Sequence, residues 1–203
     1  MASVAAPYGL KPVNLIGGQP YAGSTRTFLI DPAGTAANIY NGSPVYVNAS
    51  GYLAVATATG ADATTNGFPA GTANTGIVGV FVGCSYVNAQ GQQIWSQYYP
   101  TGTTGVVTAS VVDDYDTVFQ VQSAGSVTQA ALGANVFFST GAVVTGSTST
   151  GNSTASVVAG SSAVTTTAAF RVVGFVSTPG DTATDILVKI NPGYHSYTNA
   201  VGL

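Results

Sequence analysis

The sequence predicts an all-β protein, built as an antiparallel β-barrel or sandwich with at most one short helix. Short runs rich in Val, Ile, Phe and Tyr recur along the chain, separated by Gly, Pro, Asn and Asp, and this pattern is typical of strands joined by turns. Apolar residues make up 45% of the chain and the net charge is only −3, which favours a folded core over disorder. A length of 203 residues suits one large β domain.

Residues 1–25 predict an extended N-terminal arm. Three prolines and four glycines interrupt this segment, so it cannot form a continuous helix. The apolar side chains between them need a surface to cover them, and we expect the arm to lie on a neighbouring subunit. The candidate partner-binding residues of the arm are Tyr8, Leu10, Pro12, Val13, Leu15, Ile16 and Tyr21.

Residues 26–192 predict a single β-rich domain. A strand at 27–30 ends at Asp31-Pro32, and strands at 44–48 and 52–56 surround Ser50-Gly51 as a hairpin. A loop follows at about 57–75. The next strands are predicted at 76–83, with apolar residues on both faces, and at 92–99.

The second half of the domain predicts another hairpin, in which strands 106–112 and 117–122 flank a turn at 113–116. Ser126 and Gln129 have the spacing of a capping box and predict the one short helix. Residues 139–169 are almost entirely Ser, Thr, Gly, Ala and Val, which leaves surface strands or a long excursion open.

Strands at 170–176 and 186–190 close the domain, and residues 193–203 form a C-terminal tail. Tyrosine offers a large contact area with a polar tip, and aromatic residues are enriched at interfaces. We therefore add Tyr194, His195 and Tyr197 of the tail to the candidate partner-binding residues. Arg26 joins them because it lies where the arm meets the domain.

Charge is the most unusual property of the chain. Only four basic and seven acidic residues occur, and none of the acidic ones is glutamate. An ordinary soluble domain is about a quarter charged, and surface charge keeps a diffusing protein in solution. We expect other protein to cover much of this surface, as in a subunit of a large assembly. The chain also lacks the basic patch of a nucleic-acid-binding protein and any polybasic or amphipathic helix for a membrane.

No set of residues predicts catalysis, a metal site or a cofactor. Asp113, Asp114 and Asp116 are the only acidic cluster, and we interpret them as a solvated turn, with a calcium site as the alternative. His195 is the only histidine and no nucleophile-elbow motif is present, so we expect no enzyme. Cys84 is the only cysteine and is expected to be a small buried apolar residue.

Several segments resemble a family of tailed-bacteriophage virion proteins, the capsid decoration or cement proteins. The resemblance touches both ends and the middle, about half the chain, and the motifs that carry it are residues 6–19 (APYGLKPVNLIGGQ), 21–26 (YAGSTR), 78–85 (VGVFVGCS), 113–116 (DDYD) and 186–197 (ILVKINPGYHSY). It implies a β-rich protein bound to the outside of an icosahedral head, commonly as a trimer, with no catalytic role. Its implied partners are the major capsid protein and further copies of the same chain.

The function expected from the sequence is therefore to staple neighbouring major capsid protein subunits on the outer surface of the virion. A receptor- or glycan-binding β protein of the head or tail is the first alternative, because exposed Tyr and Trp95 in a Ser/Thr/Gly-rich chain suit sugars. A β-rich hydrolase that joins His195 to a Ser and an Asp is a third class.

Overall fold

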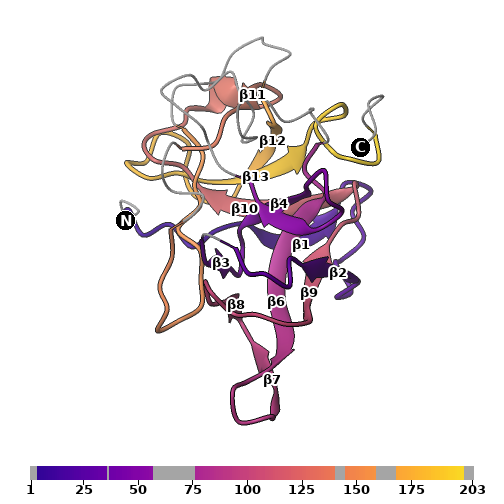
Figure 1. The fold of residues 1–203 in the computed structure, drawn as a ribbon. Coiled ribbons are helices and arrows are strands. Elements are labelled where there is room, and N and C mark those ends of the chain that lie inside the picture. The colour runs from indigo at the N-terminus through magenta and orange to yellow at the C-terminus, as the bar shows by residue number, and fades with distance from the viewer. Residues whose placement is uncertain (1–3, 36, 57–75, 140–144, 159–167, 199–203) are drawn as a thin grey trace.

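The computed structural model describes residues 4–35, 37–56, 76–139, 145–158 and 168–198. The fold is all-β, as predicted, and consists of two larger sheets and one two-stranded sheet (Figure 1). Within the described residues the one helical element is a short 3₁₀ turn, and no helix is long and apolar enough to cross a membrane. The expected loop at 57–75 and the end of the tail at 199–203 lie outside these ranges.

Five strands of the six-stranded sheet close into a barrel, because β4 pairs with both β5 and β6. β7 lies outside this ring, paired to the end of β6, and projects from the body of the molecule (Figure 1). β2 and β5 are parallel and the other pairs are antiparallel. In sheet order the strands are β4 (Pro44–Val47), β5 (Leu53–Val55), β2 (Arg26–Ile30), β9 (Val107–Val112), β6 (Gly79–Val87) and β7 (Gln93–Ser96).

The second large sheet is antiparallel throughout and lies above the barrel in Figure 1. The predicted hairpin of β4 and β5 and the last two predicted strands are confirmed. In sheet order the strands are β1 (Lys11–Leu15), β10 (Thr117–Gln122), β13 (Asp185–Ile190), β12 (Phe170–Phe175) and β11 (Asn135–Val136). β3 (Ile39–Tyr40) and β8 (Tyr98–Tyr99) form the small sheet.

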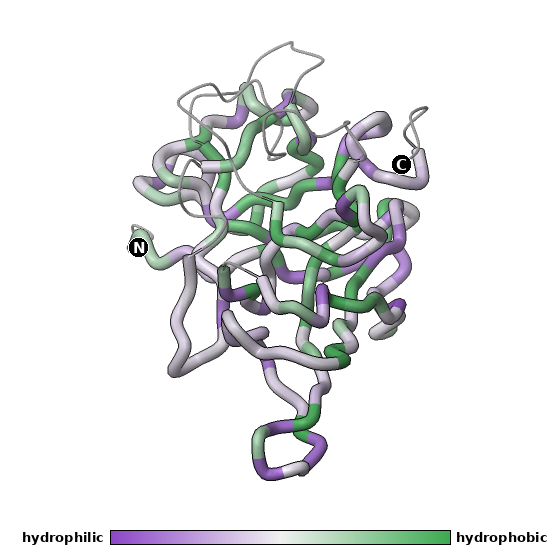
Figure 2. The backbone as a smooth tube through the Cα atoms, in the orientation of Figure 1, coloured by the Kyte–Doolittle hydropathy of each residue, from purple (hydrophilic) through white to green (hydrophobic). Residues whose placement is uncertain are grey.

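Two apolar cores hold these sheets. One fills the barrel around Phe81 and Tyr99 and contains Cys84, which is fully buried. The other joins the second sheet, through Phe119 and Phe170, to side chains on the barrel strands. In Figure 2 the apolar stretches run along the strands, whereas the end of the β6–β7 hairpin is mostly polar.

The predicted hairpin of residues 106–122 is wrong. Both strands form, but β9 lies in the barrel between β2 and β6, whereas β10 lies in the second sheet between β1 and β13. Residues 113–116 therefore cross from one sheet to the other. Two strands joined by a short polar segment can pair or diverge, and local sequence does not distinguish these outcomes.

The N-terminal arm is extended, as predicted, but it lies on its own domain. β1 pairs with β10, and the Leu10 side chain is only 1% exposed in the second core. Before it, the Ala6 N–H donates to Gln122 Oε1 at 2.7 Å, and Gln122 Nε2 donates to the Val4 carbonyl at 3.1 Å. Since β10 is already part of the sheet, its free edge offers the arm a nearby partner within the same chain.

The predicted helix is a single 3₁₀ turn, η1 (Gln129–Ala131), preceded by Thr128 without a side-chain capping bond. The capping box predicted from Ser126 is therefore wrong. In the Ser/Thr-rich region, residues 140–144 and 159–167 lie outside the described ranges. Ala155 and Val157 are fully buried, so the described part of this region contributes to the core.

Candidate functional site

The crossover between the two sheets collects a large share of the charge of the protein. Five of the eleven charged residues lie in it or touch it: Arg26, Asp113, Asp114, Asp116 and Lys189. Asp114 shapes the crossover itself, because its Oδ1 accepts the Asp116 N–H at 2.9 Å and its carbonyl accepts the Thr117 N–H at 3.1 Å. Asp114 therefore caps a turn, but the prediction of a solvated turn is wrong for Asp113, which is buried between the two sheets.

Asp113 is the centre of this site. Its carboxylate is 12% exposed, and Oδ2 lies 2.9 Å from Arg26 Nε on β2. The Tyr197 hydroxyl, from the C-terminal tail, donates to the same oxygen at 2.7 Å. The Arg26 guanidinium also lies 5.2 Å from the centre of the Tyr197 ring. Asp113 therefore links the C-terminal tail and β2 through one carboxylate.

Tyr197 keeps its proton in this setting. Burial and the hydrogen bond to Asp113 raise the pKa of Tyr197 to about 12. The Tyr197 hydroxyl is therefore a neutral hydrogen-bond donor at physiological pH. It gives the buried Asp113 carboxylate a hydrogen bond that water cannot supply there.

His195 lies under this contact and is 1% exposed. Its Nδ1 accepts the Tyr197 N–H at 3.3 Å, and the neighbouring backbone forms a bridge with Ile77 at the start of the barrel wall. Burial lowers the pKa of His195, and the nearby Asp113 opposes this shift. The ring is therefore neutral at pH 7 and acts as a packed part of the tail.

A second ion pair joins the crossover to β13. Lys189 Nζ lies 2.6 Å from Asp116 Oδ1 and 5.7 Å from the centre of the Tyr115 ring, which in turn meets His195 edge-on at 6.4 Å between ring centres. We call this set the junction cluster; its members are Arg26, Asp113, Tyr115, Asp116, Lys189, His195 and Tyr197.

The contacts of the junction cluster join the crossover to β2, β13 and the C-terminal tail. Across the described ranges, no three His, Cys, Asp or Glu side chains are placed to share a metal ion. Nor does a described serine hydroxyl hydrogen-bond to His195, whose Nδ1 is occupied by a backbone N–H. Both findings bear only on the part of the chain that the structure describes.

The structure buries some of the predicted partner-binding residues and leaves others exposed. Leu10 and His195 are buried in their own domain, so they offer no surface to a partner. Tyr8 is tied inward, since its hydroxyl donates to Asp185 Oδ1 at 2.8 Å and burial raises its pKa. Val13 and Ile16 are 42% and 51% exposed. Arg26 and Tyr197 are also exposed, although both contact Asp113 within the chain. The remaining predicted residues that are partly buried are Pro12, Leu15, Tyr21 and Tyr194.

An exposed barrel surface was missed in the sequence. Leu29 on β2, Thr108 on β9, Ser85 on β6 and Trp95 on β7 are successive cross-strand partners, so their side chains lie in one row on the outside of the sheet. Leu29 is 49% exposed and Trp95 is 65% exposed.

Two further exposed side chains extend this row. Val87 is two residues beyond Ser85 on β6, and Val106 immediately precedes β9. We call the six residues Leu29, Ser85, Val87, Trp95, Val106 and Thr108 the outer barrel face. None of them is charged. Alternation of apolar and polar residues along a strand would have indicated which side chains face outward. β2 and β6 carry apolar residues on both faces, so this alternation is not visible in their sequences.

Comparison of the chain with protein-family models, with curated proteins and with solved structures found no match.

Proposed function

We propose that this chain is a structural protein of a tailed-bacteriophage virion, a capsid decoration protein that binds the outside of the head. Its partner is the major capsid protein, and it acts as a homo-oligomer, in the simplest case a trimer. The observation that carries the proposal is the outer barrel face, an uncharged surface with large exposed apolar side chains. Such a surface favours a protein whose partner covers it.

The internal pairing of charge supports the same reading. Arg26 and Lys189 are half of the four basic residues, and both pair with carboxylates of the same chain. Asp185 also accepts a hydrogen bond from Tyr8. These contacts within the chain leave fewer charged groups to pair with a partner. Attachment then depends on apolar burial, which salt does not screen.

The outer barrel face replaces the arm as the main contact. Fully burying a Val, Leu or larger side chain contributes about 1.5–3 kcal/mol, and association costs several kcal/mol that this gain must exceed. One face binds weakly on that arithmetic. Three faces in a trimer raise the effective affinity by ~10²–10⁴-fold, because the second and third contacts are intramolecular.

Co-sedimentation of the purified protein with undecorated phage heads tests the proposal. We expect binding that changes little between low salt and about 1 M salt. Leu29→Ser and Trp95→Ser should weaken it at least tenfold, whereas Leu132→Ser should not. Leu132 is a matched control because it is 50% exposed, close to Leu29, but lies after η1 and away from the barrel face. Loss of binding in high salt, or equal effects of the three variants, would contradict the proposal.

The contribution of the arm can be measured without removing it. Deleting residues 2–24 would also remove β1 and Leu10 from the folded domain, so a failure to bind would be ambiguous. Val13→Ser and Ile16→Ser change only exposed side chains. Weaker co-sedimentation of these two variants at unchanged melting temperature would place the arm in the interface as well.

A further inference from the structure

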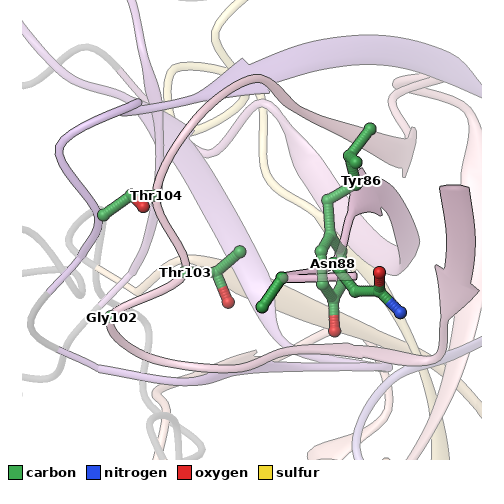
Figure 3. A pocket seen from close by; sticks show the side chains of 7 residues that line it. Tyr86, Asn88, Gly102, Thr103 and Thr104 are labelled. Carbon is green, nitrogen blue, oxygen red and sulfur yellow. The ribbon is translucent and has the colours of Figure 1, made fainter. Parts of the chain in front are cut away.

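A pocket lies where β6 ends and the chain enters β9, at the end of the barrel (Figure 3). Its volume is about 440 Å³, within the range of small-molecule sites. The mouth of a β-barrel is a common position for such sites. The lining residues are Tyr86, Val87, Asn88, Ala89, Gly102, Thr103 and Thr104.

Both walls of the pocket are held by hydrogen bonds within the chain. On one side, the Tyr99 hydroxyl donates to the Thr103 carbonyl at 2.8 Å, and Thr103 Oγ1 donates to the Pro100 carbonyl at 2.9 Å. On the other side, Asn88 Oδ1 accepts the backbone N–H groups of Gln90 and Gln92 at 3.0 and 2.9 Å. A ligand therefore meets a preformed site and loses little affinity to the ordering of loops.

The same bonds leave polar groups free to bind a ligand. Because Asn88 Oδ1 is occupied, its amide orientation is fixed, and Nδ2 uses one N–H on Gln92 Oε1 at 3.1 Å and keeps the other. Within the described residues, the hydroxyls of Tyr86 and Thr104 make no hydrogen bond. Figure 3 shows Tyr86 and Asn88 on one wall and Thr103 and Thr104 on the opposite wall.

We propose that this pocket binds an uncharged sugar unit. A sugar ring presents hydroxyls that both donate and accept, and an apolar C–H face. Asn88, Thr104 and the Tyr86 hydroxyl match the hydroxyls, and the Tyr86 ring with Val87 and Ala89 matches the C–H face. No lining residue is charged, so a phosphate or carboxylate would find no cation to pair with. A purely apolar ligand would leave the polar groups without partners.

This inference does not depend on the decoration role. It assigns the chain a ligand-binding activity that is separate from attachment to the head. The two proposals use different residues apart from Val87, so each can fail without the other.

Titration of the purified protein, followed by NMR, with the methyl glycosides of glucose, galactose, mannose and N-acetylglucosamine tests the assignment. We expect at least one of these four probes to bind in the millimolar range, and sialic acid to bind more weakly. Tyr86→Phe and Thr104→Val each remove one hydroxyl and should weaken binding about 3- to 10-fold. Tyr52→Phe is the matched control, because the Tyr52 hydroxyl makes no hydrogen bond within the described residues and does not line the pocket.

Two results would overturn the proposal. One is the absence of binding by all four glycosides at about 10 mM to the folded protein. The other is binding that Tyr86→Phe and Thr104→Val leave unchanged while their melting temperatures stay within about 2 °C of the parent.

Discussion

The junction cluster makes an ordered prediction about stability, in which the buried carboxylate matters more than the exposed cation. Asp113→Ala removes both the Arg26 and the Tyr197 contacts. Hydrogen bonds to a charged group contribute about 1.5–3 kcal/mol. Arg26→Ala removes only one of these contacts and leaves Asp113, which is 12% exposed, with its hydrogen bond from Tyr197. Because the Arg26 side chain is 62% exposed, water can take the place of its guanidinium beside the carboxylate.

These exposures set the expected magnitudes. We expect Asp113→Ala to lower the free energy of unfolding by about 2–3 kcal/mol. Tyr197→Phe removes one bond at a partly exposed ring and should cost about 1.5 kcal/mol. Arg26→Ala breaks a pair with an exposed member and should cost about 0.2–1 kcal/mol, well below the ~3–5 kcal/mol of a fully desolvated pair.

Thermal and denaturant unfolding of the three variants measures this order. For a chain of this size about 1 kcal/mol corresponds to roughly 2–4 °C in melting temperature, so Tyr197→Phe should melt about 3–6 °C lower than the parent protein. Tyr52→Phe controls for loss of a hydroxyl as such and should fall within about 0.5 kcal/mol of the parent. The reasoning is refuted if Arg26→Ala costs as much as Asp113→Ala, or if Tyr197→Phe matches Tyr52→Phe.

Three further perturbations test other parts of the structure. Burial lowers the pKa of His195 below its ordinary 6.5 in the native state, so the unfolded chain binds this proton first as the pH falls. The free energy of unfolding should therefore be highest above about pH 6.5 and should decline below it by at most ~1.4 kcal/mol per pH unit. His195→Gln should flatten that decline when melting temperatures are measured from pH 7.5 to 5. Burial raises the pKa of Cys84 to about 12, so its thiol should not react with a thiol-specific reagent at pH 8 until the protein is unfolded in guanidinium. Rapid labelling of the native protein would contradict the position of Cys84 in the barrel core. A Cβ at Gly79 would lie 2.1 Å from the Val112 carbonyl oxygen, so Gly79→Ala should destabilise the barrel by about 1–3 kcal/mol or prevent folding. Gly17→Ala is the control, because a Cβ there meets nothing within 4 Å and the variant should melt close to the parent protein.

Local pattern was sufficient for the strands and insufficient for their partners. β4 and β5 were predicted as a hairpin because a Ser50-Gly51 turn lies between two β-rich runs, and they pair in that way. β9 and β10 offered the same kind of signal around residues 113–116 but lie in different sheets. The choice depends on which other strands compete for each edge, and those strands are distant in the sequence.

The sequence pointed to three of the seven members of the junction cluster, and as partner-binding residues rather than as contacts within the chain. Arg26, His195 and Tyr197 were selected for their positions at the arm junction and in the tail, and the structure brings them together around Asp113. Local sequence could not predict that these side chains face their own domain, because His195 is buried only when the C-terminal tail folds back against the barrel. The pocket at Tyr86 was also missed, since its walls come from two loops whose residues carry no distinctive motif.

The construction of β1 has a consequence for how this molecule behaves when many copies are crowded together. An exposed sheet edge invites another chain to add a strand, and few like charges are present to keep copies apart. β1 begins with Lys11 and Pro12 and contains an irregularity before Asn14, which are devices that discourage such growth. The chain then folds back, so that the N–H groups of residues 15 and 21 bond to the carbonyls of residues 19 and 13 within the same molecule. Although the protein carries little charge, the edge of the sheet at β1 is therefore protected against adding a strand from another copy.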